Sequence, residues 1–209
     1  MKIIVGCEKS QVVTAAFRAL GHEAYSCDTS DCSGGHPSWH LRGNVLEYLN
    51  NGWDLMIAHP PCTYLCVTAN KWLKDQPPRK SGALVGAERR QARVEACEFF
   101  MALWNAPIDK ICIENPVGVM STLWRLPDQI IQPYQFGHPE PKKTCLWLKN
   151  LPKLIPTNVV EPEYHLTKSG KRLPKWYAYA DKSKGQHHRA EIRSKTFHGI
   201  ASAMANTWG

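Results

Sequence analysis

A four-residue apolar run that ends in two prolines constrains the fold more than any other stretch of this 209-residue chain. Leu55 to Ala58 predict a short strand that is buried on both faces, as in a parallel sheet. Pro60 and Pro61 must end that strand, because proline donates no hydrogen bond to a strand ladder. Cys62 then lies at the carboxyl end of a strand, which is where open α/β sheets bind their ligands.

A second short strand with polar residues at its end supports a functional role for Cys62. Free cysteines are most often small buried hydrophobes, so one thiol alone is weak evidence for a nucleophile. Residues 110–113 predict another buried strand, and Glu114, Asn115 and Pro116 follow it. Parallel strands end at one edge of a sheet, so we expect Cys62 and Glu114 to face one crevice.

Residues 1–28 predict the first βαβ unit of a nucleotide-binding fold. A strand over residues 2–6 precedes a helix whose apolar positions run from Val12 to Leu20, and Gly21 closes that helix. The second strand, residues 22–28, ends in Asp28, a carboxylate placed to hold ribose hydroxyls. The turn between strand and helix lacks a complete G-x-G-x-x-G pattern, so no pyrophosphate of a dinucleotide needs to lie at this helix N-terminus.

The two strand ends also carry a family resemblance. Pro60-Pro61-Cys62 resembles the Pro-Cys motif, and Glu114-Asn115-Pro116 the Glu-Asn-Val motif, of DNA methyltransferases that modify carbon 5 of cytosine. The chain is similar to compact phage and prophage members of this family, most clearly over residues 53–66, 111–118, 134–148 and 193–209. The resemblance implies an α/β, Rossmann-like fold of the methyltransferases that use S-adenosylmethionine, with a mixed, mostly parallel sheet, flanking helices and a small basic insertion.

The resemblance assigns roles to individual residues. Cys62, Glu114 and Asn115 would be catalytic, together with Lys142, which stands for the first arginine of the family's Gln-x-Arg-x-Arg motif. The turn after the first strand departs from the family's Phe-x-Gly-x-Gly, so close backbone approach to the cofactor would depend on one glycine. The expected cofactor-binding residues are Gly6, Cys7, Glu8, Ser10, Asp28, Asn44, His59 and Pro60. Asn44 replaces the family's acid and would accept the adenine amino group through its side-chain oxygen.

The net charge of +8 is concentrated in one part of the chain. Residues 140–195 contain 13 Lys and Arg against 5 Asp and Glu, whereas residues 1–139 contain 13 of each. A phosphate backbone is a natural partner for such a segment, although a solvated basic face would have the same composition. Residues 63–86, basic and aromatic with little periodicity, predict a lid over DNA. The expected DNA-binding residues are Lys71, Lys74, Arg79, Lys80, Lys142, Lys143, Lys171 and Arg172.

The remaining pattern predicts how the chain is divided. We expect a catalytic core that binds S-adenosylmethionine over residues 1–140, a small basic DNA-recognition region over 141–190, and a C-terminal helix over 191–209 that returns to the core. The pattern also predicts a helix over 87–105, a short helix or turn over 118–126, and strands over 130–134 and 143–148. A recognition region this small predicts short or relaxed sequence specificity.

Composition excludes several other classes of protein. No stretch approaches the roughly 18 apolar residues of a membrane helix, and the start of the chain is too short for a signal peptide. We therefore expect the eight cysteines to be reduced. Cys27, Cys32, His36 and His40 lack the spacer of a zinc finger, so no metal is expected. These features predict a monomer in the cytoplasm of a bacterial host, where a phage could encode it, with DNA as its partner.

The chemistry expected is methylation of carbon 5 of cytosine in DNA. The Cys62 thiolate would add to carbon 6 of a flipped base, and Glu114, with a pKa raised by burial, would share a proton with ring N3. Two alternatives stay open. His59-Pro60-Pro61 also resembles the Asp/Asn-Pro-Pro-aromatic motif of enzymes that methylate amino groups, N4 of cytosine or N6 of adenine. A DNA-binding protein with this fold and no catalysis is the other.

Overall fold

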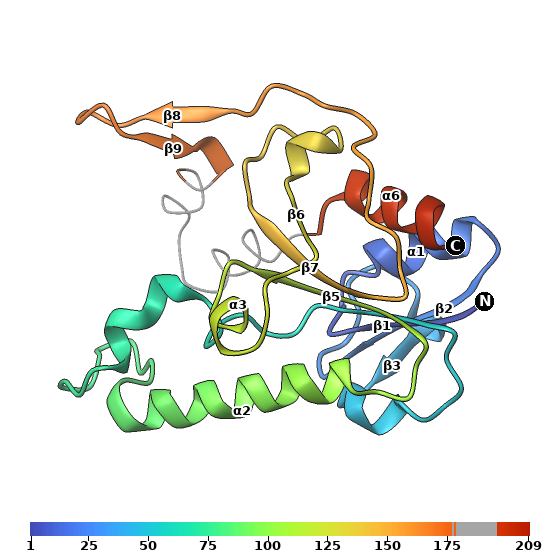
Figure 1. The fold of residues 1–209 in the computed structure, drawn as a ribbon, viewed down its shortest axis with the longest axis horizontal. Coiled ribbons are helices and arrows are strands. Elements are labelled where there is room, and N and C mark those ends of the chain that lie inside the picture. The colour runs from blue at the N-terminus through green and yellow to red at the C-terminus, as the bar shows by residue number, and fades with distance from the viewer. Residues whose placement is uncertain (177, 179–195) are drawn as a thin grey trace.

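The computed structural model of the protein describes residues 1–176, 178 and 196–209. Figure 1 shows a twisted sheet with helices on both faces and a hairpin that projects from it. The strands are β1 (Lys2–Gly6), β2 (Glu23–Asp28), β3 (His40–Arg42), β4 (Leu55–Ala58), β5 (Lys110–Pro116), β6 (Gln129–Ile131), β7 (Thr144–Lys149), β8 (Tyr164–Leu166) and β9 (Arg172–Pro174). The helices are α1 (Val12–Ala19), α2 (Gly86–Trp104), α3 (Met120–Leu123) and α6 (His198–Trp208), with 3₁₀-helices η1 (Pro37–Trp39), η2 (Val45–Tyr48), η3 (Val67–Leu73) and η4 (Pro133–Gln135).

The main sheet has seven strands in the order β3-β2-β1-β4-β5-β7-β6. In this order the first five strands are parallel to one another, and β7 runs antiparallel between β5 and β6. This arrangement confirms the predicted fold class, a mixed, mostly parallel Rossmann-like sheet of the methyltransferase type. The chain reverses its direction of winding between β1 and β4, and open sheets bind ligands at the carboxyl ends of strands beside such a reversal.

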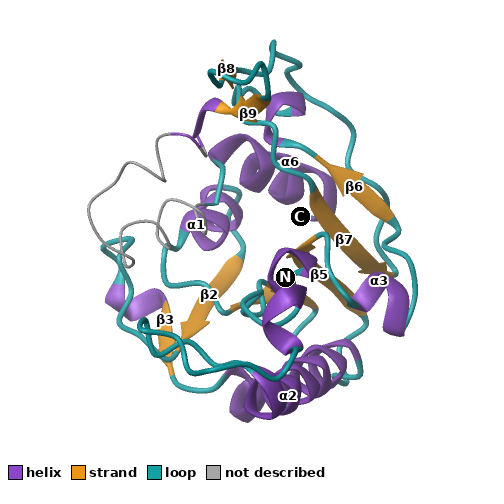
Figure 2. Cartoon of the chain, turned by 90° about the vertical axis from the view of Figure 1, so that its left-hand side faces the viewer, coloured by secondary structure: helices purple, strands orange, loops and turns teal. Residues whose placement is uncertain are grey.

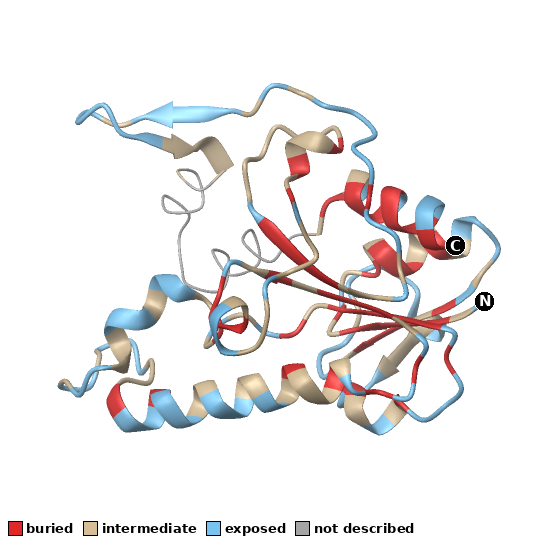
Figure 3. Ribbon diagram, viewed as in Figure 1, coloured by how far each residue is buried: buried red, intermediate tan, exposed pale blue. Residues whose placement is uncertain are grey.

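Apolar residues that alternate along each strand fill two cores, one on each face of the sheet. Ile3 and Val5 of β1 face α1 and α6, whereas Ile4 faces α2. The central strands are therefore buried on both sides, as Figure 3 shows in red. Turned by 90°, the molecule shows α2 on one side of the sheet and α1 with α6 on the other (Figure 2). This double burial explains why β1 and β4 have continuous apolar sequences.

Most predicted elements are present, and α2 differs in how it is buried. Val94, an apolar residue in the first half of this helix, is 49% exposed, whereas Phe100 and Leu103 are buried. The first half of α2 extends beyond the sheet and contacts the η3 segment, where Arg90 donates to the Leu73 carbonyl and to Asp75. Only the second half of α2 therefore packs on the sheet.

The C-terminal part also differs from the predicted division. β7 lies inside the main sheet, which therefore extends past the boundary expected at residue 140. A turn at Ser169-Gly170 joins β8 to β9. α6 begins at His198, and its Gly199 lies so close to η4 that a Cβ there would overlap the Phe136 carbonyl. The predictions for residues 179–195, including the start of the C-terminal helix, lie outside the described residues.

The cysteines are free thiols, and His36 and His40 of the loop after β2 contact neighbouring residues. All eight cysteines are free. Cys27 is buried in β2, while His36 stacks on Trp39 and His40 hydrogen-bonds to Ser26 and to the Ser30 carbonyl. Within the described ranges, no helix combines the length and the apolar character that crossing a membrane requires.

Candidate functional site

A cavity of about 760 Å³ lies at the carboxyl ends of the central strands. Its volume falls within the range of small-molecule sites in proteins. The walls come from the turn after β1, the end of β2, the segment after β4, the end of β5, the start of β7 and the beginning of α6. The lining residues proposed from the sequence are Cys7, Glu8, Ser10, Asp28, His59, Pro60, Cys62, Glu114, Asn115 and Lys142.

The Cys62 thiol has a pKa below the ordinary cysteine value. The neighbouring Cys66 thiol hydrogen-bonds to it and Lys142 attracts its negative form, so that its pKa falls to about 7 against the opposing effects of burial and Glu114. Cys7 lines the same cavity, but burial and the nearby Asp28 carboxylate raise its pKa to about 12. Because the thiolate is the nucleophilic form of cysteine, Cys62 is the more reactive of these two thiols near neutral pH.

Two arginines of α2, not foreseen from the sequence, hold the loop that follows Cys62. The buried Arg89 donates to the Thr63 carbonyl at 3.1 Å, and Arg93 donates to the Tyr64 carbonyl at 2.8 Å. On the other side, the Leu65 carbonyl accepts from the Val119 amide at 2.8 Å. Cys62 is therefore followed by a loop that is fixed from two directions.

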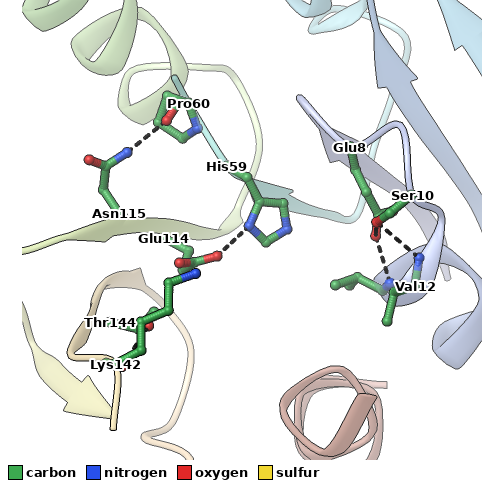
Figure 4. A network of polar contacts seen from close by, with 10 residues as sticks. Glu8, Ser10, Val12, His59, Pro60, Glu114, Asn115, Lys142 and Thr144 are labelled. Atoms are coloured by element: carbon green, nitrogen blue, oxygen red, sulfur yellow. Dashed lines mark hydrogen bonds and ion pairs between the residues drawn. The ribbon is translucent and has the colours of Figure 1, made fainter. Parts of the chain in front are cut away.

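Glu114 lies in the same cavity and is paired with His59. Nδ1 of His59 donates to Oε2 of Glu114 at 2.7 Å, and both side chains are largely buried (Figure 4). Burial alone would raise the pKa of Glu114, but the hydrogen bond and charge of His59, with Lys142, lower it. Burial likewise would lower the pKa of His59, but Glu114 and Glu8 raise it.

This pair corrects one expectation. The sequence predicted a Glu114 with a raised pKa because only its burial was considered, whereas the structure gives it a cationic partner. Both pKa shifts therefore favour the carboxylate form of Glu114 and a proton on His59. We expected His59 to contact the cofactor, and its Nδ1 is instead engaged by Glu114. Its Nε2, which is buried, has no hydrogen-bond partner among the described residues.

Asn115 braces the two strand ends against each other. Its side-chain amide donates to the Pro60 carbonyl at 2.7 Å, as Figure 4 shows, and the residue is 2% exposed. Its Oδ1 has no partner in the described part of the chain. Asn115 can therefore hold the Pro60-Pro61 turn and still offer an acceptor to a ligand.

The turn after β1 is organised by Glu8 and not by glycine. The Glu8 carboxylate accepts from the Val13 amide at 2.7 Å, the Thr14 amide at 3.2 Å and the Thr14 hydroxyl at 2.7 Å. It thus occupies the N-terminus of α1, where backbone amides and the helix dipole favour an anion. In a dinucleotide-binding protein a pyrophosphate takes that place, so this carboxylate argues against such a ligand.

Two residues with side chains adopt the left-handed backbone conformation that glycine usually takes in this turn. They are Cys7, with φ 58°, and Gln11, with φ 61°. The Gln11 side chain is 1% exposed and binds three partners: Nε2 donates to the Ser26 hydroxyl and the His36 carbonyl, and Oε1 accepts from the His36 amide. These bonds connect the turn to β2 and to the loop that follows it. No signal in the sequence indicates this role of Gln11.

Of three residues expected to bind the cofactor, Asp28 lines the cavity, whereas Gly6 and Asn44 do not. Gly6 is buried away from the cavity lining, and a Cβ there would lie 2.9 Å from Val45 Cγ2, so it serves packing. Asn44 is exposed, and its Oδ1 accepts from the Leu46 amide at the start of η2. That oxygen therefore has a structural partner, and Asn44 is absent from the lining. Asp28 does line the cavity, with Oδ1 accepting from the Ser30 amide.

Among the basic residues expected to bind DNA, Lys142 lines the cavity. Arg79 lies over the Trp72 ring at 3.9 Å beside η3, and Arg172 lies over Tyr164 at 4.2 Å in the β8–β9 hairpin. Figure 1 shows η3 and the hairpin projecting on the same side of the molecule. The exposed members of the set are Lys71, Lys74, Lys80, Lys143, Lys171 and Arg172.

Comparisons with known proteins give limited information. No family model matches the chain, and no curated protein matches it. One similar solved structure is described as a candidate DNA modification methyltransferase encoded within an E. coli prophage. The two chains are 12% identical with a TM-score of 0.46, and the match covers 77% of this chain. This chain spans about half (52%) of the length of that one.

Proposed function

We propose that the protein methylates carbon 5 of cytosine in DNA, with S-adenosylmethionine as the methyl donor. One observation carries this proposal: the ends of the adjacent parallel strands β4 and β5 bring Cys62 and Glu114 into one cavity, beside the turn after β1. A thiol of lowered pKa near a carboxylate suits addition to the electron-poor carbon 6 of a pyrimidine. Methylation of an amino group needs no such thiol.

The cavity residues fit the proposed cofactor. Asp28 could accept ribose hydroxyls through its second oxygen. The Glu8 carboxylate, fixed at the N-terminus of α1, puts negative charge beside the place of a cationic sulfonium. Nε2 of His59 is a buried polar atom that a polar group of the cofactor could satisfy. When bound, the cofactor supplies an electrophilic methyl group.

The chain's own residues would act on the base. The Cys62 thiolate adds to carbon 6, which makes carbon 5 nucleophilic, and Glu114 contacts the N3 edge of the ring. Lys142 lowers the energy of negative charge near both groups. Asn115 keeps the Pro60-Pro61 turn in place and presents Oδ1 to the base. A cytosine can reach this cavity only after it leaves the duplex, because the thiolate must approach the ring from above its plane.

DNA is the partner that the surface charge supports. The basic hairpin β8–β9 and the η3 segment would contact the backbone on either side of the extruded base, since phosphate contacts dominate affinity and basic side chains provide them. The small size of the recognition region predicts that sequence specificity is short or relaxed.

Transfer of label to DNA tests the proposal. DNA is incubated with the protein and methyl-labelled S-adenosylmethionine, digested to nucleosides and separated by chromatography. We expect label in 5-methylcytosine, no transfer by Cys62→Ala, and normal transfer by Cys32→Ala, which removes a thiol outside the cavity. Label on adenine or on N4 of cytosine, or transfer that survives Cys62→Ala, would refute the mechanism. Intact DNA binding with no transfer to several natural DNAs would indicate a protein without catalysis.

A further inference from the structure

The proposed chemistry needs a proton donor for ring N3, and the His59–Glu114 pair bears on which group that donor is. Addition of a thiolate to carbon 6 requires a proton at N3, and a carboxylic acid at Glu114 would supply it. In the structure Glu114 Oε2 instead accepts a hydrogen bond from His59 Nδ1 at 2.7 Å, and His59 and Lys142 favour its carboxylate form. The proton must therefore come from another group in the cavity.

His59 is placed to be that group. Its Nδ1 is 2.7 Å from Glu114 Oε2, and the ring lies between Glu114 and the Glu8 turn (Figure 4). The charged groups that act on it are Glu114 at the end of β5, Glu8 after β1 and Lys142 before β7. The two carboxylates favour the imidazolium and the lysine opposes it, with a net rise in the pKa of His59.

We infer that His59 is a positioning residue that stores the N3 proton and exchanges it through Glu114. This inference rests on the proposed function. When Cys62 adds, the carbon 6–sulfur bond forms, the Nδ1–H bond of His59 breaks and an N3–H bond forms by way of the Glu114 carboxyl group. The thiolate and the imidazolium thereby become a neutral adduct and a neutral imidazole, and Glu114 ends as it began, a carboxylate. Elimination of Cys62 returns the proton to His59.

This arrangement balances charge inside a closed cavity. Without His59, a carboxylic acid at Glu114 would become a carboxylate when the thiolate adds, so the cavity would keep one negative charge before and after the step. With His59 present, the addition cancels one negative and one positive charge, so no net charge is created where solvation is poor. The pair also allows Cys62 to be a thiolate and the proton donor to be charged at the same pH.

Titration of the resting protein is the first test, since it needs neither substrate nor cofactor. The ring protons of His59 are followed by NMR against pH in the wild type and in Glu114→Gln, with His22, which lies outside the cavity, as an internal reference. We expect His59 to titrate above the usual histidine value near 6.5 in the wild type. In Glu114→Gln it should titrate below that value, because burial lowers the pKa of His59 and the charge of Glu114 no longer raises it. A His59 that is neutral at pH 7, or that titrates equally in both proteins, would overturn the inference.

The second test measures formation of a covalent adduct with DNA that contains 5-fluorocytosine, in the presence of S-adenosylmethionine. Once carbon 5 carries both the methyl group and fluorine it has no proton to lose, so Cys62 cannot be eliminated and the adduct accumulates. His59→Asn is the informative variant, because an asparagine amide can take the place of Nδ1 and hold Glu114 but has no proton to give. We expect adduct formation to slow by about 100-fold, the lower range for loss of general-acid catalysis, with little change in DNA affinity. The wild-type rate should fall at high pH as His59 deprotonates, and that fall should be absent in His59→Asn. His22→Asn is the matched control and should behave as the wild type.

The outcomes distinguish this inference from the proposed function. Wild-type protein that forms no adduct would refute the proposed function, and this inference with it. A wild-type adduct together with a His59→Asn variant of equal rate and equal pH profile would refute the inference alone. The thermal melting of His59→Asn is measured in parallel to show that the variant folds. If it does not fold, the NMR titration of His59 in the wild type decides whether the inference holds.

Discussion

The Glu8 carboxylate at the N-terminus of α1 provides a prediction whose size follows from the contacts. Glu8 is 3% exposed, and its two oxygens divide their bonds: Oε1 accepts from the Val13 amide, and Oε2 accepts from the Thr14 amide and hydroxyl. In Glu8→Gln one of these oxygens becomes an NH₂ group. At least one buried amide donor then faces another donor, whichever way the new side chain is turned.

The expected loss of stability is about 1–4 kcal/mol. An unsatisfied buried donor costs about 1–3 kcal/mol, and loss of a negative charge at a helix N-terminus adds about 0.3–1 kcal/mol. For a chain of this length, 1 kcal/mol corresponds to about 2–4 °C in Tm, so the melting temperature should fall by about 3–16 °C. Glu88→Gln is the matched control, because Glu88 occupies the first turn of α2 but is exposed. Its effect should stay within about 0.5 kcal/mol.

Denaturant unfolding followed by circular dichroism measures both variants. If Glu8→Gln unfolds at the same denaturant concentration as Glu88→Gln, Glu8 does not organise the turn in the way described. Hydrogen exchange at the amides of Val13 and Thr14 gives a local measurement. Both amides should exchange faster in Glu8→Gln, and unchanged protection would contradict the capping role.

Two further predictions concern Cys62 and Gln11. Alkylation of Cys62 by iodoacetamide should accelerate through a midpoint near pH 7 and level off above it, because only the thiolate reacts, and Cys66→Ala should move that midpoint upward as the thiol that lowers the pKa of Cys62 is lost. Mass mapping of the labelled peptide measures this, and an unmoved midpoint would contradict the role of Cys66. Gln11→Ala should loosen the loop after β2, since three hydrogen bonds to Ser26 and His36 are lost, and it should increase proteolysis within residues 29–39. Equal cleavage of variant and wild type would contradict it.

The buried strands could be predicted from the sequence because they combine two strong local signals. β1 and β4 are short continuous apolar runs, and prolines stop β4. The alternation of Ile3, Ile4 and Val5 between two cores follows from the period of a strand, so both faces had to be apolar. The sequence therefore contained enough to predict that Cys62 and Glu114 share one edge of the sheet.

The charge state of the site could not be predicted in the same way. His59 and Glu114 are 55 residues apart in sequence, and their contact depends on the register between β4 and β5. Burial of a carboxyl and a cationic partner shift its pKa in opposite directions, and only the first was apparent from the apolar surroundings. The turn after β1 was misread for a related reason. Glycines are visible in a sequence, whereas a Glu8 or Gln11 that takes over their structural task is not.

The positions of the charges along the sheet edge give the reaction a direction. The carboxylates of Glu8 and Asp28 follow β1 and β2, whereas His59 and Lys142 follow β4 and precede β7. Strands are spaced about 4.8 Å apart, so the ends of β2 and β5 are separated by three spacings, about 14 Å. In the proposed reaction a cationic methyl donor would be favoured beside the carboxylates of Glu8 and Asp28. The pyrimidine would then lie toward Glu114 and Lys142, with Cys62, which follows β4, between the two ends in the order of the strands.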